Sequence, residues 1–181
     1  YGLGKNYAEW VIGNKNKIIN QEPQFEKISF RPFDSKYTVY NNNLLWRWRD
    51  NTMKHLLYED NIGIVTARQC VGDWRYIFIT KNIGEFNFTG TAGRFGSGYF
   101  LPLYLYHEEE CQAQLIQSTA KDKPARTPNL DHEIVADIAK AIGLNFTNEK
   151  EATAGTFAPM DILDYIYAVL HSPTYRETYK E

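Results

Sequence analysis

The sequence predicts an α+β fold, with a mixed, mainly antiparallel sheet from the first two thirds of the chain and helices packed on it late. Two observations carry this prediction. Short segments within residues 28–106 alternate apolar and polar residues or are rich in Val, Ile, Phe and Tyr, which is typical of strands. Longer segments with apolar residues at helical spacing follow at 134–142 and 162–170.

The first strands are expected near the start of this region. Residues 28–30 alternate in the way of a half-buried strand, and Pro32 should end that strand or confine it to a sheet edge. Residues 37–40 are rich in strand formers, and the asparagines at 41–43 predict a turn after them.

The next segment combines aromatic and basic residues. Residues 45–49 alternate, so a strand would place both tryptophans on one face and Arg47 and Arg49 on the other. Thr52 is the expected cap of a short helix that follows, carrying Met53, Leu56 and Leu57.

Three further strands are expected at 62–67, 76–80 and 100–106. Between the last two, residues 84–98 contain five glycines and no apolar periodicity, which predicts a loop with Arg94 at its tip.

Two helices dominate the last part of the chain. The isoleucines 134, 138 and 142 recur every four residues behind a cap at Asn129 or Asp131, and Gly143 is the expected stop. The final helix should begin at Pro159 and end before Pro173.

Charge is distributed unevenly along the chain. Residues 1–100 contain 13 Lys and Arg against 9 Asp and Glu, whereas residues 101–181 contain 7 against 13, and the whole chain carries −2. We expect one domain, 1–181, with an entry segment at 1–27, a strand-rich basic part at 28–106 and a helical acidic part at 107–181. The basic part could meet DNA phosphates, and a merely local imbalance is the alternative.

Several classes of protein are disfavoured. No apolar run reaches the about 18 residues of a membrane helix. The two cysteines, Cys70 and Cys111, are too few for a disulfide framework, which favours a cytoplasmic location. Segment 90–98 lacks the context of a phosphate loop. No nucleophile, acid–base pair or metal-ligand spacing stands out, so we expect no catalytic site, metal or cofactor in this chain.

Basic residues beside aromatic residues or after strands are the best candidates for function. Arg68 and Gln69 follow a predicted strand and supply side chains that suit guanine and adenine in the major groove. Arg47 and Arg49 can bridge a guanine edge or grip phosphate. The candidates for phosphate contacts are Lys54, Arg75, Lys81 and Arg94.

Structural roles are the alternative for these arginines. Arg47 and Arg49 could form an ordinary exposed strand face, and Arg68 could pair with Asp73. For Arg31, a salt bridge with Asp34 that fixes the turn at Pro32 is the favoured interpretation.

Five motifs occur in the order in which one known family has them. They are Phe30-Arg31-Pro32-Phe33-Asp34 with Tyr37 and Tyr40, Met53-Lys54-His55, Ala67-Arg68-Gln69, the segment Phe100–Tyr106, and a final helix from Asp161 followed by Ser172-Pro173-Thr174-Tyr175-Arg176. Over roughly residues 28–180 the chain resembles the C-terminal target recognition (specificity) domain of type ISP restriction–modification enzymes and related single-chain restriction–methyltransferases. It departs from the family pattern at Ala158, where a polar cap is usual, and at Glu181, short of the family's hydrophobic tail.

The resemblance implies a non-catalytic domain that reads the sequence of double-stranded DNA in a bacterial cytoplasm. An adenine-specific DNA methyltransferase part and a nuclease part would lie upstream in a longer polypeptide, with S-adenosylmethionine and Mg²⁺ as their cofactors. The start at Tyr1, without an initiator Met, is what an excised piece would show.

A second class of function stays open. The chain could be a structural or protein-interaction domain that docks on a methyltransferase or helicase through its acidic helical part. Salt discriminates the two classes, because apolar contacts survive moderate salt and phosphate contacts do not.

Overall fold

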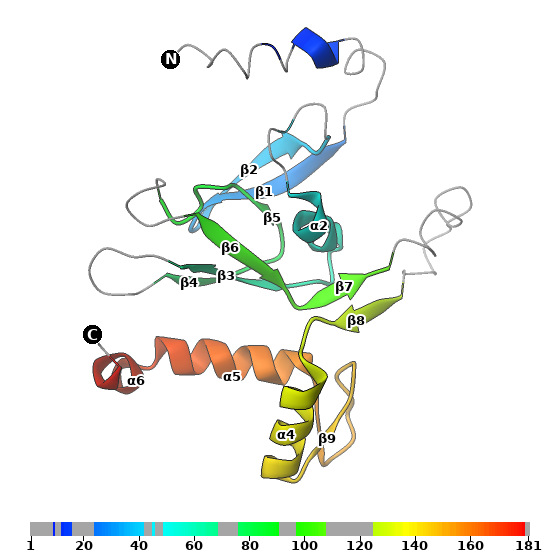
Figure 1. Cartoon of the computed structure of the whole chain (residues 1–181), viewed down its shortest axis with the longest axis vertical. Coiled ribbons are helices and arrows are strands. Elements are labelled where there is room, and N and C mark those ends of the chain that lie inside the picture. Colours follow the sequence, from blue (N-terminus) through cyan, green and yellow to red (C-terminus); the bar gives the residue numbers. More distant parts are fainter. Residues whose placement is uncertain are drawn as a thin grey trace.

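The computed structural model of the chain describes residues 9, 12–15, 24–41, 45, 49–68, 76–90, 97–107 and 125–179. These residues form several small sheets, mostly antiparallel, followed by helices late in the chain, so the predicted α+β class is confirmed (Figure 1). No helix in the described part of the chain is long and apolar enough to cross a membrane.

An antiparallel hairpin opens the strand-rich part. β1 (Phe25–Arg31) pairs with β2 (Asp34–Val39), and Pro32 and Phe33 form the turn between them. The prediction that Pro32 ends the first strand is confirmed, since proline cannot donate to a strand ladder. β5 (Ile83–Gly84) adds a short third strand parallel to β1.

The central sheet has β3 (Gly63–Ala67) between β4 (Ile77–Thr80) and β6 (Gly98–Pro102), with both pairings antiparallel. The strands expected at 62–67 and 76–80 are confirmed to within one residue. The loop expected at 84–98 is confirmed for the turns at 85–90, whereas Gly84 ends β5 and Gly98 begins β6; residues 91–96 lie outside the described part.

The single strand expected at 100–106 is two strands. β6 ends at Pro102, and β7 (Tyr104–Tyr106) pairs instead with β8 (Arg126–Pro128). The break lies at Leu103, whose N–H donates to the Ile62 carbonyl at 2.7 Å. Because Gly63 pairs with Pro102, this bond continues the ladder with β3, and the next residue, Tyr104, pairs with Pro128 of β8.

The segment expected as a strand at 45–49 is not a strand at its described ends. The Leu45 N–H donates to the Asn41 carbonyl at 2.9 Å, a helical-type turn. Arg49 has left-handed backbone (φ 51°) and is the N-cap residue of α2 (Asp50–Met53), which continues as the 3₁₀ turn η1 (Lys54–Leu57). The short helix is confirmed, but the prediction that Thr52 caps it is wrong. Thr52 lies inside the helix, and its N–H donates to the carbonyl of the N-cap residue, Arg49.

The late helices begin and end largely where the sequence predicts. Asp131 caps α4 (His132–Ile142) by accepting from two backbone N–H groups, and Gly143 ends it with φ 68°. A short parallel pair, β9 (Asn145–Phe146) with β10 (Thr156–Phe157), leads to α5 (Pro159–His171). Pro173 follows the end of α5 as expected, and it also begins α6 (Pro173–Thr178).

Hydrophobic clusters cover both faces of the central sheet. On one face Val65, Phe88 and Phe100 pack with residues of α2, η1 and β5. On the other face, half-buried Ile64 and Ile79 pack around Tyr104, Leu103 and Leu163 of α5. Figure 1 accordingly shows β1, β2 and α2 on one side of the central sheet and α5 on the other.

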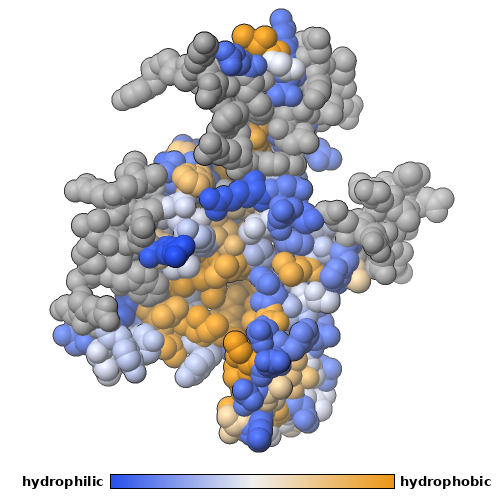
Figure 2. Space-filling view, viewed as in Figure 1, coloured by the Kyte–Doolittle hydropathy of each residue, from blue (hydrophilic) through white to orange (hydrophobic). Residues whose placement is uncertain are grey.

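Several large apolar side chains of the late helices are exposed. On α4, Ile134 is 60% exposed and Ile142 is 51% exposed, while the buried residue is Val135. On α5, Leu163 is buried and Tyr165 and Ile166 are exposed. Figure 2 shows hydrophobic residues gathered on this helical part and in the middle of the same face.

Candidate nucleic-acid interface

The central sheet brings three chain segments together at one of its ends. Ala67 pairs with Gly98, and its N–H donates to the Tyr76 carbonyl at 3.3 Å. The exposed Arg68, at which the chain leaves β3, therefore lies beside Tyr76 and Ser97, where the chain enters β4 and β6.

Arg49 and Phe86 reach the same end. The Gly98 N–H donates to the Phe86 carbonyl at 3.1 Å, which places residue 86 at the start of β6. Phe86 is 45% exposed, and the Arg49 guanidinium carbon lies 5.1 Å from the centroid of its ring. We refer to Arg49, Arg68, Phe86 and Ser97 as the sheet-end surface. A cavity of about 160 Å³ with mostly apolar walls lies between Arg49 and Phe86 and the core residues behind them.

Two non-glycine residues of the described part have positive φ, Phe33 (64°) and Arg49 (51°). Left-handed backbone costs such residues roughly 1–2 kcal/mol. Phe33 is 101% exposed, so burial of its ring does not offset this cost. Residues held in such conformations cluster at binding sites, so the hairpin turn and Arg49 are both candidates for contact with a ligand.

Arg31 connects that turn to the sheet-end surface. Its guanidinium pairs with Glu85 at 2.6 Å, directly before Phe86 in the chain. The predicted salt bridge between Arg31 and Asp34 is wrong. Arg31 faces Asp34 across the hairpin, but its guanidinium contacts Glu85, 54 residues away in sequence.

The structure separates the lysine candidate Lys81 from Arg68. Lys81 is exposed but follows β4 at the opposite end of the strand, roughly 13 Å away along it. Lys54 is half-buried and begins η1. The remaining candidates, Arg47, Gln69, Arg75 and Arg94, lie outside the described residues, as does Asp73, the alternative partner of Arg68.

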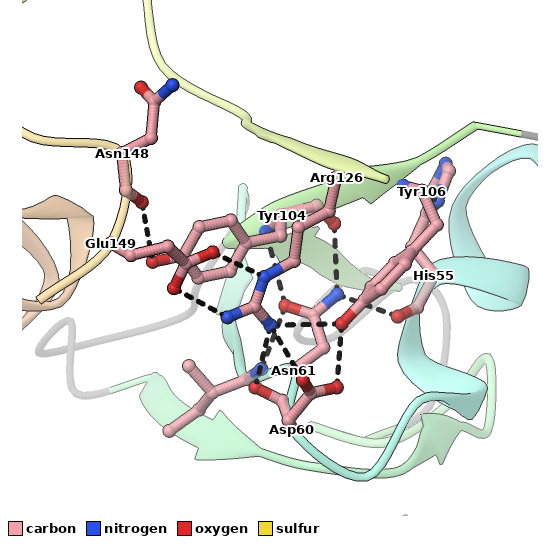
Figure 3. Close-up of polar contacts among 9 residues, drawn as sticks. His55, Asp60, Asn61, Tyr104, Tyr106, Arg126, Asn148 and Glu149 are labelled. Atoms are coloured by element: carbon pink, nitrogen blue, oxygen red, sulfur yellow. Dashed lines mark hydrogen bonds and ion pairs between the residues drawn. The ribbon is translucent and has the colours of Figure 1, made fainter. Parts of the chain in front are cut away.

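A polar cluster around Arg126 links the strand-rich part to the helical part (Figure 3). Arg126 of β8 binds Glu149 through two hydrogen bonds of 2.7 Å and pairs with Asp60 at 3.1 Å. Its guanidinium carbon lies 4.0 Å from the centroid of the Tyr104 ring. The hydrogen bonds with Glu149 raise the pKa of Arg126 above its ordinary value, so the cation is held firmly.

Tyrosine and asparagine side chains complete this cluster. The Tyr106 hydroxyl donates to Asp60 at 2.8 Å, and burial together with this bond raises the pKa of Tyr106 to about 12. The buried Asn61 accepts from the backbone N–H of Tyr104 and donates to carbonyls of Tyr104 and His55. With its charge matched by two carboxylates, Arg126 acts as a structural clamp.

The sequence prediction did not identify Arg126 or Phe86. Arg126 stands in a three-residue strand with no apolar pattern, and its partners are 23 and 66 residues away in sequence. Phe86 lies in a segment whose glycines predicted only a loop. Among the described residues, no group of His, Cys, Asp and Glu could hold a metal ion.

Comparison with solved structures supports the fold. A cryoEM structure of a DrdV–DNA complex matches with a TM-score of 0.59 at 18% identity, over 93% of this chain and 14% of that chain. The ATP-dependent type ISP restriction–modification enzyme LlaBIII bound to DNA matches with a TM-score of 0.57 at 18% identity, over 94% and 10%. The chain thus spans a small fraction of the length of either protein.

No curated protein matches the chain. A family model does, over residues 7–181, and it describes the type ISP C-terminal specificity domain. The resemblance carried by the five sequence motifs is confirmed by this match, which includes nearly the whole chain. This chain belongs to the family of type ISP C-terminal specificity domains.

Proposed function

We propose that this chain is the part of a longer restriction–modification enzyme that recognises a specific sequence in double-stranded DNA. The observation that carries the proposal is the family match over residues 7–181. The structures of two similar proteins, DrdV and LlaBIII, contain bound DNA, which favours DNA as the partner of this chain.

The sheet-end surface supports the proposal by its chemistry. Arg49 and Arg68 are exposed, and the described part of the chain contains no ion pair of Arg49. Arginine binds phosphate and guanine through a fixed fork of N–H groups. We assign base reading to Arg68 with Gln69, and base or phosphate contacts to Arg47 and Arg49.

Phosphate contacts are assigned to the remaining basic candidates, which are Lys54, Arg75, Lys81 and Arg94. Phosphate contacts set affinity and register without carrying sequence information. Lys81 lies at the far end of β4 from Arg68, so the two can serve different roles on one duplex.

The proposal includes a division of labour within the parent enzyme. The chain would act as a single domain, 1–181, without catalysis, with its basic part at 28–106 toward DNA and its acidic part at 107–181 toward the rest of the enzyme. An upstream adenine-specific methyltransferase and nuclease, with S-adenosylmethionine and Mg²⁺, would carry out the chemistry in the cytoplasm.

The test is selection of bound duplexes from a pool with a randomised central segment, at low and at moderate salt. We expect enrichment of a short motif, with retention that falls steeply as salt rises. Retention without enrichment, or no retention at low salt, contradicts sequence recognition by this chain.

The exposed isoleucines of α4 favour a second candidate function, a protein-interaction domain that docks on a methyltransferase or helicase. Its test is binding to the upstream part of the parent enzyme at rising salt. Contacts through Ile134 and Ile142 should survive moderate salt, because burial of apolar area does not depend on screening.

A further inference from the structure

We infer that Phe86 and Arg49 form a preorganised contact in which Phe86 touches the 5-methyl group of a thymine in the major groove and Arg49 holds a neighbouring phosphate. The inference rests on the proposed DNA recognition and names a residue, Phe86, that determines specificity at one base pair.

The first support is the mutual position of the two side chains. The Arg49 guanidinium lies over the Phe86 ring at 5.1 Å from its centroid, and both side chains are exposed. A cation over an aromatic face is held by the ring quadrupole, so Arg49 is oriented before any ligand arrives. Less side-chain entropy is then lost on binding.

The second support is the rigid anchoring of the segment that presents Phe86. The Glu85 N–H donates to Ser29 and the Gly98 N–H to Phe86, both at 3.1 Å, so two strands hold the segment. The Glu85 carboxylate also accepts from Arg31 and from the Asn87 N–H. An exposed aromatic ring on such a base has a fixed position relative to the sheet.

The third support is the electrostatic environment. The carboxylates that adjoin Phe86 and Arg49 in sequence have other partners: Glu85 pairs with Arg31, and Asp50 accepts from the Tyr40 hydroxyl at 3.1 Å. Among the described residues Arg49 makes no ion pair, so its charge is available to an anion. Arg49 also has strained, left-handed backbone, and such strain is found frequently at binding sites.

The exposure of the ring decides which apolar part of DNA it suits. Phe86 is 45% exposed, so more than half of the surface of this residue is covered by the protein. A ring so held can touch a group in a groove but cannot insert between base pairs, which requires a protruding wedge. In the major groove the apolar group is the thymine methyl, and phenylalanine is among the side chains that contact it.

The test uses the motif selected by the 181-residue chain, with each thymine in turn replaced by deoxyuridine, which removes only the methyl group. Dissociation constants are measured for the wild type, Phe86→Ala, Phe86→Leu and Arg49→Gln. Phe25→Ala is the control, because Phe25 is also an exposed phenylalanine but lies in β1, at the far end of the hairpin from its turn.

At one thymine, deoxyuridine should weaken wild-type binding about fourfold, as expected for one buried methyl group. Phe86→Ala should bind the thymine and deoxyuridine duplexes equally at that position, and Phe86→Leu should keep part of the discrimination. Arg49→Gln should keep the discrimination and reduce the salt slope by about 0.9. The Phe25→Ala control should behave as wild type.

Several results would overturn the inference. They are a selected motif without thymine, no deoxyuridine effect at any position, and an unchanged effect in Phe86→Ala. Those results leave DNA recognition itself intact. If the wild-type chain selects no motif, the proposed function fails, and this inference fails with it.

Discussion

At the scale of single residues, Arg126 makes several side-chain contacts that could not be predicted from the sequence. Its guanidinium binds Glu149, Asp60 and the Tyr106 hydroxyl, and each of these contacts spans 20 or more residues. Pairing over such distances depends on the folded chain. Arg68 could be predicted as a candidate because its signal is local, a basic residue at the end of a recognisable strand.

The Tyr106 hydroxyl makes the cluster sensitive to alkaline pH. Folding raises the pKa of Tyr106 from 10.0 to about 12, so its neutral form stabilises the native state fully below about pH 10. This contribution is lost as pH rises from 10 to 12. We predict that Tyr106→Phe costs about 1 kcal/mol at pH 7 and makes the alkaline loss of stability shallower.

Urea unfolding of both proteins across this pH range measures the effect. Tyr165→Phe is the matched control, because Tyr165 is 71% exposed. An alkaline dependence of Tyr106→Phe as steep as that of the wild type would contradict the assignment.

The turn residue Phe33 carries strain that its ring does not offset. We predict that Phe33→Asn raises the free energy of unfolding by about 1 kcal/mol, because asparagine tolerates left-handed backbone better. Little is lost with the ring, since it is fully exposed and only its edge approaches Phe78, at 6.2 Å between centroids. Phe33→Leu lacks a short polar side chain that can hydrogen-bond locally, so it should give no gain; equal stabilisation by both changes would refute the strain account.

At the scale of elements, the start of α5 shows how a helix begins without a polar side chain at its N-cap. Ala158 is the N-cap residue and is 1% exposed, so its methyl group is part of the packed interior. It has no acceptor, and Asp161 at N3 supplies the reciprocal half of a capping box by accepting from the Ala158 N–H at 2.9 Å.

Hydrogen bonds from Lys150 and the Ala158 N–H lower the pKa of Asp161 below its ordinary value. The ionised carboxylate therefore stabilises the fold above about pH 4, and this contribution is lost as pH falls through the lowered pKa. We predict that Asp161→Ala costs about 1 kcal/mol at pH 7 and less at acidic pH. Chemical unfolding at both pH values, beside Asp164→Ala on the exposed side of α5, checks this; a constant difference at all pH values would count against it.

Elements with their own local signals could be predicted, and elements defined by partners could not. Asp131, Gly143 and Pro159 mark helix ends through backbone chemistry that acts within a few residues. The strand predicted from the alternation at 45–49 is wrong at its described ends, because the chain enters α2 there through Arg49 with left-handed backbone. β8, β9 and β10 have two or three residues each, too few for a periodic pattern.

At the scale of the whole molecule, the basic part at 28–106 and the acidic part at 107–181 are joined by side-chain contacts. The Arg126 cluster joins Asp60 and Tyr106 of the strand-rich part to Glu149 of the helical part. The sheet-end surface is formed by the basic part, and the exposed isoleucines belong to the acidic part. These two surfaces fit the proposed contacts, one with DNA and the other with the rest of a longer enzyme.

The most direct test of base reading by Arg68 is a scan of the selected duplex in which every base pair is changed in turn. Binding is measured for the wild type, Arg68→Ala and Lys81→Ala. We predict that Arg68→Ala loses discrimination at one base pair, worth about 1–3 kcal/mol, and that Lys81→Ala weakens all duplexes alike and flattens the salt slope. Equal loss on every duplex from both changes would contradict sequence reading at the sheet-end surface.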